Sequence, residues 1–246
     1  MKISATIVAL NEEANIARAI ASLGCAVEIV VVDSGSADRT REIAAGLGAR
    51  IVEEPWRGYA AQKNFASAAA AHDWILSIDA DEALTPELAA EIAALGDDPP
   101  FRGYNMPRLA QYLGRWIRHS GWYPDRKIRL FDRRRGAWAG AYVHESVRLD
   151  GPAGQLHGNL LHYTCNSLSE HLRTLDRYTT LAAQEVLARN APVPTRRLLA
   201  DPAWTFVRTY VFRRGFLDGP QGLAIAWMAA LYTFLKYAKA WQERAR

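Results

Sequence analysis

The chain is poor in cysteine and has no long uninterrupted apolar run. Of its 246 residues only Cys25 and Cys165 are cysteines, too few to build a disulfide-stapled scaffold. No apolar stretch reaches the roughly 18 residues that a membrane-spanning helix needs. The first residues also lack the basic segment followed by an apolar run that is typical of a signal peptide. We therefore expect neither a spanning segment nor a secretory signal, and a protein that stays in a reducing compartment. Because half of the residues are apolar, intrinsic disorder is excluded.

Glycine-rich phosphate loops are also missing. No G-x-G-x-x-G follows the first predicted strand, and G-x-x-x-x-G-K-[ST] does not occur. Such loops hold phosphate groups with backbone N–H donors, so their absence argues against a dehydrogenase or a P-loop ATPase. A bound diphosphate would instead need a metal ion to neutralise it.

Charge is distributed unevenly along the chain. Residues 1–100 hold 7 Lys and Arg against 16 Asp and Glu, whereas residues 101–246 hold 23 against 10. Such asymmetry suggests that the second part meets an anionic partner, which could be nucleic acid, a phosphorylated substrate or a membrane surface. A solvated basic face is the simpler alternative.

The first 95 residues alternate between strand and helix patterns. Short apolar runs predict strands buried on both faces, and runs with helical spacing follow them. The predicted strands are residues 3–9, 27–32, 49–52 and 74–78, and helices are predicted from about residue 16 and over 37–47, 59–71 and 86–95. This order predicts an α/β fold with an open, mostly parallel sheet and helices on both faces.

Polar side chains follow three of these strands where each strand ends. Asn11 and Glu12 follow the first, Asp33 the second, and Asp79 and Asp81 the fourth. Ligands of open parallel sheets bind beyond the carboxyl ends of the strands. Carboxylates there suit hydrogen bonds to a base or ribose and ligation of a divalent cation. The aspartate pair could instead cap the next helix.

At these residues the chain resembles the family-two glycosyltransferases of the GT-A fold, in particular the small bacterial enzymes that add glucose to the inner core of lipopolysaccharide. The matching stretches are residues 7–13 (IVALNEE), 31–40 (VVDSGSADRT), 62–64 (QKN) and 77–82 (SIDADE). The resemblance implies a UDP-sugar donor and transfer of a hexose, in the first place glucose, to a saccharide acceptor.

The resemblance also implies roles for single residues. Glu12 and Asp33 would contact the nucleobase, Asp79 the ribose, and Asp81 would bind Mg²⁺ or Mn²⁺ on the diphosphate. Lys63 would contact the donor at a position where the family more often has arginine. The opening strand also departs from the family, with Val8 and Leu10 where proline and tyrosine are common.

Inverting sugar transfer needs a general base near the acceptor hydroxyl. Glu145 lies in the β-prone run of residues 142–147, where the resemblance places the base of the family; a salt bridge to a nearby arginine is the alternative. Asp125 is the second candidate, although a turn role after Pro124 suits it better. His144 would point away from Glu145 on a strand, which favours a packing or acceptor-side role.

The resemblance further places His162 at the metal and diphosphate, although a histidine beside apolar residues can equally belong to the core. Residues 102–135 hold ten Lys and Arg interleaved with Trp116, Trp122 and Tyr123. Arginine forks bind phosphate and aromatic rings stack on sugars, so we expect a phosphorylated or lipid-linked saccharide acceptor. Single-stranded nucleic acid would suit this composition too, but the acidic donor edge would repel it, so no nucleic acid is expected.

Residues 196–246 combine tryptophan, tyrosine and phenylalanine with flanking arginine and lysine. This composition is typical of helices that lie in a lipid interface, although packing on the sheet or a dimer contact could also use it. We expect a GT-A catalytic domain over residues 1–165, divided into a nucleotide-sugar half (1–100) and an acceptor and catalytic half (101–165). A helical extension over 166–246 would attach the protein peripherally to the inner, cytoplasmic face of an anionic membrane.

Two other functions remain open at this point. A sugar-phosphate nucleotidyltransferase also uses an acidic metal site on an α/β sheet, but would normally have a glycine-rich, basic loop after the first strand. A non-catalytic, membrane-attached binding module with a vestigial donor site is the second. Metal-dependent nucleotide binding separates that module from an enzyme.

Overall fold

The computed structural model describes residues 1–140, 145–189 and 193–244. The chain forms two compact units. The first combines Met1–Arg108 with Asp125–His162, and the second combines Leu109–Pro124 with Tyr163–Arg246. His144, for which the sequence suggested a packing or acceptor-side role, lies outside the described residues.

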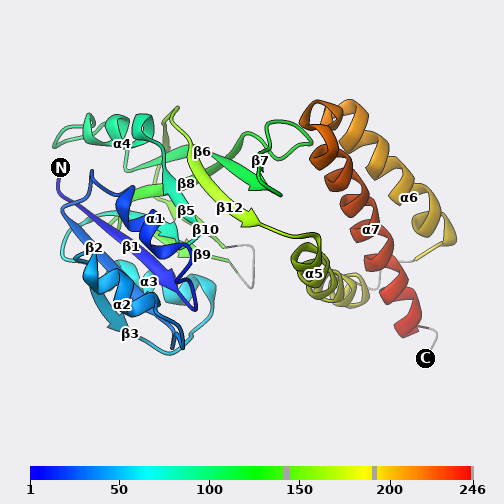
Figure 1. Cartoon of the computed structure of the whole chain (residues 1–246), viewed down its shortest axis with the longest axis horizontal. Coiled ribbons are helices and arrows are strands. Elements are labelled where there is room, and N and C mark those ends of the chain that lie inside the picture. Colours follow the sequence, from blue (N-terminus) through cyan, green and yellow to red (C-terminus); the bar gives the residue numbers. More distant parts are fainter. Residues whose placement is uncertain (141–144, 190–192, 245–246) are drawn as a thin grey trace. The chain divides into compact units, whose positions relative to one another are not determined.

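The first unit begins with four parallel strands in the order β3-β2-β1-β4 (Figure 1). They are β1 (Ile3–Ala9), β2 (Glu28–Asp33), β3 (Arg50–Glu53) and β4 (Trp74–Asp79). Ile7 of β1 lies opposite Val31 of β2 and Ile78 of β4. These strands coincide with the predicted ones to within one residue at each end, because a continuous apolar run can only be satisfied where both faces of a strand are covered.

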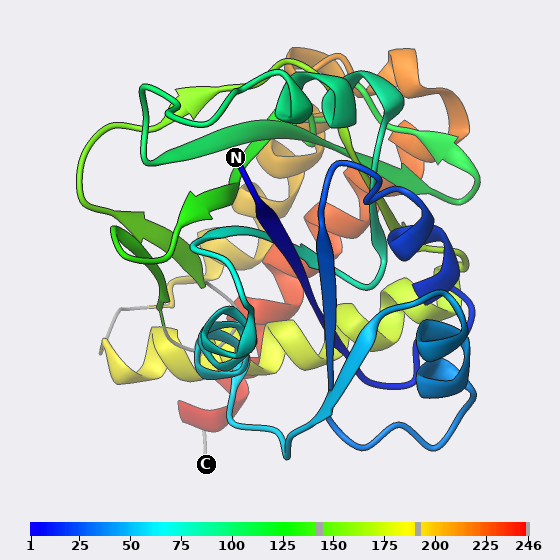
Figure 2. The ribbon, with the colours of Figure 1, turned by 90° about the vertical axis from the view of Figure 1, so that its left-hand side faces the viewer.

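Helices cover both faces of these strands. The four are α1 (Ile16–Ala21), α2 (Thr40–Gly46), α3 (Tyr59–Ala69) and α4 (Pro86–Ala93). In Figure 2 the blue helices α1 and α2 lie to one side of β1 and β2, and α3 lies to the other. The core divides accordingly: Ile7 packs in the cluster that contains α1, α2 and α4 residues, and Val30 and Val32 pack with Ala66 of α3.

Beyond β4 the sheet continues with antiparallel strands. β8 (Asp125–Asp132) pairs antiparallel with both β4 and β6 (Gly103–Tyr112), and β12 (Leu160–Cys165) pairs antiparallel with β5 (Glu82–Leu84). The remaining strands are β7 (Arg115–Trp116), β9 (Gly136–Ala139), β10 (Ser146–Leu149) and β11 (Gly154–Gln155). β9 and β10 pair as a separate antiparallel ribbon. The predicted α/β class, with helices on both faces and a helical extension, is confirmed.

The second unit is mostly helical. Its elements after β12 are α5 (Leu168–Ala188), α6 (Thr195–Val207), the π-helical segment η1 (Arg208–Phe212), the 3₁₀ turn η2 (Gly215–Asp218) and α7 (Gly219–Arg244). α7 packs against both α5 and α6. Among the described residues no helix combines the length and the apolar character that crossing a membrane requires.

A buried carboxylate joins two segments of this unit that are far apart in the chain. Asp218, only 2% exposed, accepts hydrogen bonds from the backbone N–H groups of Arg118 and His119, at 3.2 and 3.1 Å, and from the Ser120 hydroxyl at 3.1 Å. A Cβ atom at Gly222 would lie 1.8 Å from the carbonyl oxygen of Gly215, so this close approach of backbone to backbone requires glycine. Residues 109–124 are therefore fastened to the helical unit.

Candidate active site

The loops after β1 and β2 are joined by hydrogen bonds. Asn11 stands in the left-handed region at φ 55°, which asparagine tolerates better than most residues. Its Oδ1 accepts from the N–H of Ala37 at 2.8 Å, and its own N–H donates to the Ser36 hydroxyl at 2.9 Å. Asn11 thus shapes the rim of the predicted donor edge.

The charge of Glu12 interacts with those of Asp79 and Asp81, the acidic pair that follows β4. Its Oε2 accepts from Asn15 Nδ2 at 2.8 Å. Burial raises the pKa of Glu12, the hydrogen bond from Asn15 opposes that rise, and the charges of Asp81, Asp38 and Asp79 add to it. The carboxylates predicted to meet at one sheet edge therefore do influence one another.

Asp33 closes the turn after β2. It is fully buried and accepts from the N–H groups of Gly35 and Ser36 at 3.0 and 2.8 Å, and from the Ser36 hydroxyl. Gly35 has φ 102°, a conformation that favours glycine. Both carboxylate oxygens are used in holding the turn, and a nucleobase contact of Asp33 stays a prediction.

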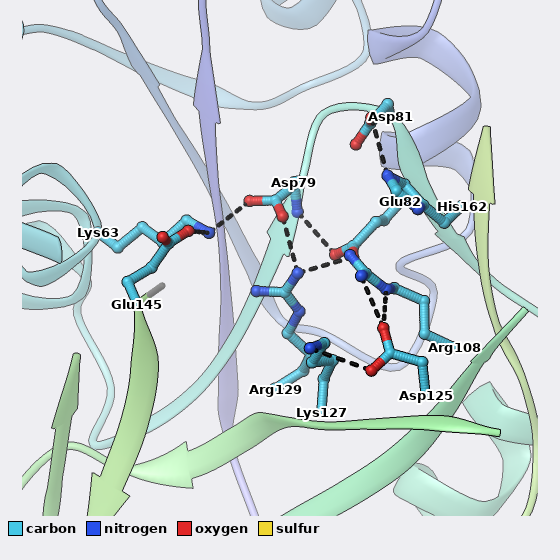
Figure 3. A network of polar contacts seen from close by, with 10 residues as sticks. All are labelled: Lys63, Asp79, Asp81, Glu82, Arg108, Asp125, Lys127, Arg129, Glu145 and His162. Atoms are coloured by element: carbon cyan, nitrogen blue, oxygen red, sulfur yellow. Dashed lines mark hydrogen bonds and ion pairs between the residues drawn. The ribbon is translucent and has the colours of Figure 1, made fainter. Parts of the chain in front are cut away.

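Asp79 and Asp81 have different partners, as Figure 3 shows. Asp79 bonds to Lys63 Nζ and to Arg129 Nη2, both at 2.7 Å. Asp81 instead lies 3.2 Å from the Nε2 atom of His162. Burial by itself would raise the pKa of Asp79, but Arg129 and Lys63 outweigh it and hold that pKa well below its ordinary value. Asp79 is therefore a charged, fixed carboxylate, and Asp81 is the one that pairs with a potential metal ligand.

Behind Asp79 a chain of ion pairs runs across the strands (Figure 3). The fully buried Glu82 carboxylate contacts Arg129 at 2.7 Å and Arg108 at 3.3 Å. Arg108 in turn bonds to Asp125 at 2.7 Å, and Lys127 lies 3.1 Å from the same carboxylate. The neighbouring carboxylates Asp79 and Glu82 overcome the cost of burying Arg129 and raise its pKa.

Asp125, the second candidate for the base, is thus held between two cations. Burial alone would raise its pKa, but Arg108 and Lys127 lower it below the usual value. It begins β8 and is not a turn residue. Sequence reasoning treated Arg129 only as part of a basic stretch and gave Arg108 and Glu82 no role. The signal for Arg129 was the two-residue period of a strand, which puts residues 125, 127 and 129 on one face.

Glu145 lies directly before β10. Its Oε1 is 3.2 Å from Lys63 Nζ, and its Oε2 is buried without a hydrogen-bond partner in the described part of the chain. Lys63 Nζ also lies 4.3 Å from the ring centre of Trp138. Lys63 therefore joins Asp79 and Glu145, which are far apart in the sequence.

A cavity of about 320 Å³ opens beside these residues, lined by Asp79, β8 residues, Trp138, and Glu145 to Val147. Three of its lining residues carry a buried polar atom that has no partner among the described residues: Arg129 Nε, Trp138 Nε1 and Glu145 Oε2. Buried polar groups are normally paired, because an unpaired one costs free energy. Two donors and one acceptor are thus left for a polar ligand.

The donor atoms for a metal ion are few. In residues 1–140, 145–189 and 193–244 no cluster of three or more His, Cys, Asp and Glu side chains is suited to hold one, and Asp81 with His162 forms a pair. Mg²⁺ usually takes one or two protein carboxylates and completes its coordination shell with substrate phosphates and water. For Mn²⁺ a carboxylate is the preferred ligand and an imidazole a weaker one. The pair fits an ion that arrives with a diphosphate.

The sequence was compared with known protein families. Residues 4–148 match the sequence model described as Glycosyl transferase family 2. The chain belongs to this glycosyltransferase family. It is therefore an enzyme that transfers sugar, and the family favours neither the nucleotidyltransferase nor the non-catalytic module.

Two relatives of the glycosyltransferase span nearly its whole length. The lipopolysaccharide core biosynthesis glycosyltransferase LpsC of Rhizobium meliloti is 34% identical over 100% of this chain and 94% of LpsC. An uncharacterized glycosyltransferase of Rickettsia typhi, RT0209, is 32% identical over 97% of this chain and 86% of that protein. The match reaches beyond residue 148, so the residues of the helical extension also have sequence counterparts in these relatives.

A similar solved structure matches a smaller part of this chain than the two sequence relatives do. Glucosyl-3-phosphoglycerate synthase of Mycobacterium tuberculosis, in complex with Mn²⁺, UDP and glucosyl-3-phosphoglycerate, is 27% identical with a TM-score of 0.35, over 45% of this chain and 44% of that one.

Proposed function

We propose that this glycosyltransferase moves a hexose, with glucose the first candidate, from a UDP-sugar to a saccharide of the lipopolysaccharide inner core, with inversion at the anomeric carbon. The buried, unpartnered Oε2 atom of Glu145 in the 320 Å³ cavity carries the proposal. A carboxylate oxygen that lacks a partner there can accept the proton of an acceptor hydroxyl. The naming of LpsC, 34% identical over this whole chain, supports the lipopolysaccharide core as acceptor.

The proposed reaction is a single displacement. Glu145 Oε2 takes the proton as the acceptor oxygen attacks the anomeric carbon, and the bond from that carbon to the diphosphate breaks, so UDP leaves with its electron pair. Lys63, bonded to Glu145 Oε1 at 3.2 Å, orients the carboxylate so that Oε2 is the free oxygen. Arg129 Nε and Trp138 Nε1 are the two donors available to substrate oxygens.

The proposed donor side uses Asp79 and Lys63 of the same network and residues of the loops after β1 and β2. Asp79 would accept hydrogen bonds from the ribose, Lys63 would contact the donor, and Glu12 and Asp33 would lie toward the nucleobase. Asp81 and His162 would hold Mg²⁺ or Mn²⁺, which when bound supplies charge neutralisation for the departing diphosphate. The roles assigned to these residues are proposals, supported by the pairing of Asp81 with His162 at 3.2 Å.

We also propose that residues 1–165 are the catalytic domain and that residues 166–246 attach the enzyme to the cytoplasmic face of an anionic membrane. The support is an exposed aromatic surface on α6, η1, η2 and α7, to which Trp204, Phe212, Phe216 and Trp227 contribute with 49 to 66% exposure. Arg213 and Arg214, both exposed, lie between Phe212 and Phe216 in the sequence. Aromatic rings with neighbouring cations suit the interface of an anionic bilayer, where a phosphorylated, lipid-linked acceptor would be found.

Calorimetric titration of UDP tests the donor half. We expect binding in the presence of Mn²⁺, loss of binding with EDTA, and no binding of UDP–Mn²⁺ by Asp81→Ala. Asp98→Ala is the matched control, because this carboxylate is 94% exposed in the same unit. Tighter binding of GDP than of UDP, or equal binding with EDTA, would contradict the proposed donor. Mass spectrometry of truncated core lipopolysaccharide, incubated with UDP-glucose or UDP-galactose, then identifies the sugar.

A further inference from the structure

The second unit contains a cavity of its own. It has a volume of about 480 Å³ and lies between α5, α6, η1, α7 and the ends of β6 and β12. Leu175 on α5 and Ile225 and Met228 on α7 contribute to its wall, with Trp122 from the loop after β7. Volumes of about 300–1,000 Å³ are usual for small-molecule sites. The cavity therefore has room for a ligand, and neither the donor nor the acceptor chemistry uses it.

The buried polar side-chain atoms of this wall all have partners within the described part of the chain. The Tyr112 hydroxyl is 2.8 Å from His171 Nδ1. The hydroxyls of Thr205 and Thr233 donate to carbonyl oxygens of their own helices at 2.8 and 3.0 Å. Within the described part of the chain, no residue of this lining has a buried polar side-chain atom that lacks a partner. A guest of this cavity need not supply hydrogen bonds, which favours an apolar one.

A cation stands at the edge of the same cavity. Arg208, exposed at the surface, lines it as the first residue of the π-helical segment η1. No ion pair or side-chain hydrogen bond of its guanidinium occurs among residues 1–140, 145–189 and 193–244. Short π-helical segments occur often at functional sites. Glu170 also lines the cavity, but its carboxylate already accepts from the N–H of Asn166 at 3.1 Å. A wall that is largely apolar, with an unpaired guanidinium at its rim, fits an amphiphile that has an apolar chain and an anionic head.

The elements around the cavity also expose the aromatic surface described above. Phe212, in the same segment as Arg208, is 66% exposed, and Trp227, next to Met228, is 61% exposed. We propose that the cavity of the second unit receives one acyl chain of an anionic membrane phospholipid, and that Arg208 pairs with its head group. This inference rests on the proposed membrane contact and is independent of the sugar-transfer chemistry.

Filling the cavity tests the proposal. The probe is a fluorescent long-chain fatty acid, titrated into the full chain below its micelle concentration. Ala229 on α7 and Thr174 on α5 line the cavity from two different helices. We expect Ala229→Trp and Thr174→Trp each to weaken binding by at least about tenfold, because an indole and an acyl chain cannot occupy the same close-packed space. Ala203→Trp, at an exposed position of α6, is the matched control and should bind as the parent protein does.

Charge recognition is tested with a second variant. Arg208→Gln should weaken binding of the fatty acid by about two- to fivefold, as expected for one solvent-exposed ion pair, and leave binding of its neutral methyl ester unchanged. Equal affinity of the parent and both filled variants, or no binding by the parent protein, would overturn the proposal. So would equal weakening of acid and ester by Arg208→Gln.

A third measurement does not depend on how the filled variants fold. A brominated fatty acid should quench the fluorescence of the parent protein, and Trp122→Phe should remove part of that quenching, because Trp122 lines the cavity. Unchanged quenching in Trp122→Phe would contradict the site. UDP–Mn²⁺ binding by each variant separates the two proposals: its retention, whatever happens to lipid binding, leaves the donor site intact.

Discussion

The two cavities of this glycosyltransferase differ in whether the buried polar atoms of their walls have hydrogen-bond partners. The cavity of the first unit contains buried polar atoms without partners on Arg129, Trp138 and Glu145. In the second unit, the hydroxyls of Tyr112, Thr205 and Thr233 are already bonded within the protein. Unpaired buried donors and acceptors cost stability and persist where a ligand will use them. A wall whose buried polar groups are satisfied offers a guest apolar contact in its interior, and here the only charge proposed for recognition is that of Arg208 at the rim.

The largest expected effect concerns the acceptor atom in the polar cavity. Glu145→Gln keeps the shape of the side chain but removes the carboxylate, and we expect turnover to fall by about 10²- to 10⁴-fold, the usual contribution of a general base. UDP–Mn²⁺ binding should not change. Glu185 is an exposed carboxylate on α5, so Glu185→Gln is the control. Its transfer rate should equal that of the parent protein. Full turnover by Glu145→Gln would remove this residue from the mechanism and make Asp125→Asn the next variant.

Breaking the chain of ion pairs around Arg129 should have the next largest effect, on the stability of the fold. Arg129→Met should lower the free energy of unfolding by about 3 kcal/mol, because the buried Glu82 and the partly buried Asp79 would lose the cation that both of them contact at 2.7 Å. Urea unfolding measures the difference. Arg135→Met removes an exposed pair with Asp150 and should cost no more than about 1 kcal/mol. Similar unfolding midpoints for the two variants would show that the buried network is not needed for folding.

A smaller effect distinguishes the surfaces of the two units. Trp227→Ser should weaken binding to vesicles that contain phosphatidylglycerol by about tenfold, since burying one large side chain is worth roughly 1.5–3 kcal/mol. Trp56→Ser, at a tryptophan of the first unit with 49% exposure, should leave sedimentation with vesicles unchanged. If Trp56→Ser had the larger effect, the membrane-binding surface would have to be assigned to the first unit.

The smallest effect is a pH dependence in the apolar cavity. Burial lowers the pKa of His171, so below the unfolded value of about 6.5 the unfolded chain binds a proton more readily than the folded one. Stability should therefore decrease as the pH falls through that value toward the folded pKa. His171→Gln should make this decrease shallower, whereas His157→Gln, at an 80% exposed site, should not. Parallel pH profiles for the parent and His171→Gln would contradict the assignment.

Much of the first unit could be read from local patterns. The apolar runs that became β1 and β4 and the proline that starts α4 are interactions between residues close in the chain, so sequence spacing reveals them. The same holds for the convergence of Glu12, Asp79 and Asp81, because the carboxyl ends of parallel strands share one edge. Family membership then followed from motifs at that edge.

The partners of these residues depended on the tertiary structure. Lys63 meets Glu145 across 82 positions of sequence, and Arg129 meets Asp79 across 50. The antiparallel strands after β4 and the inclusion of residues 109–124 in the helical unit are equally distant pairings. The sequence by itself determined which residues could form strands, helices and a charged edge, because short-range sterics and periodic burial decide these. Which buried polar atom keeps a partner and which is left for a ligand was decided only by long-range packing, because that depends on every group that arrives from elsewhere in the chain.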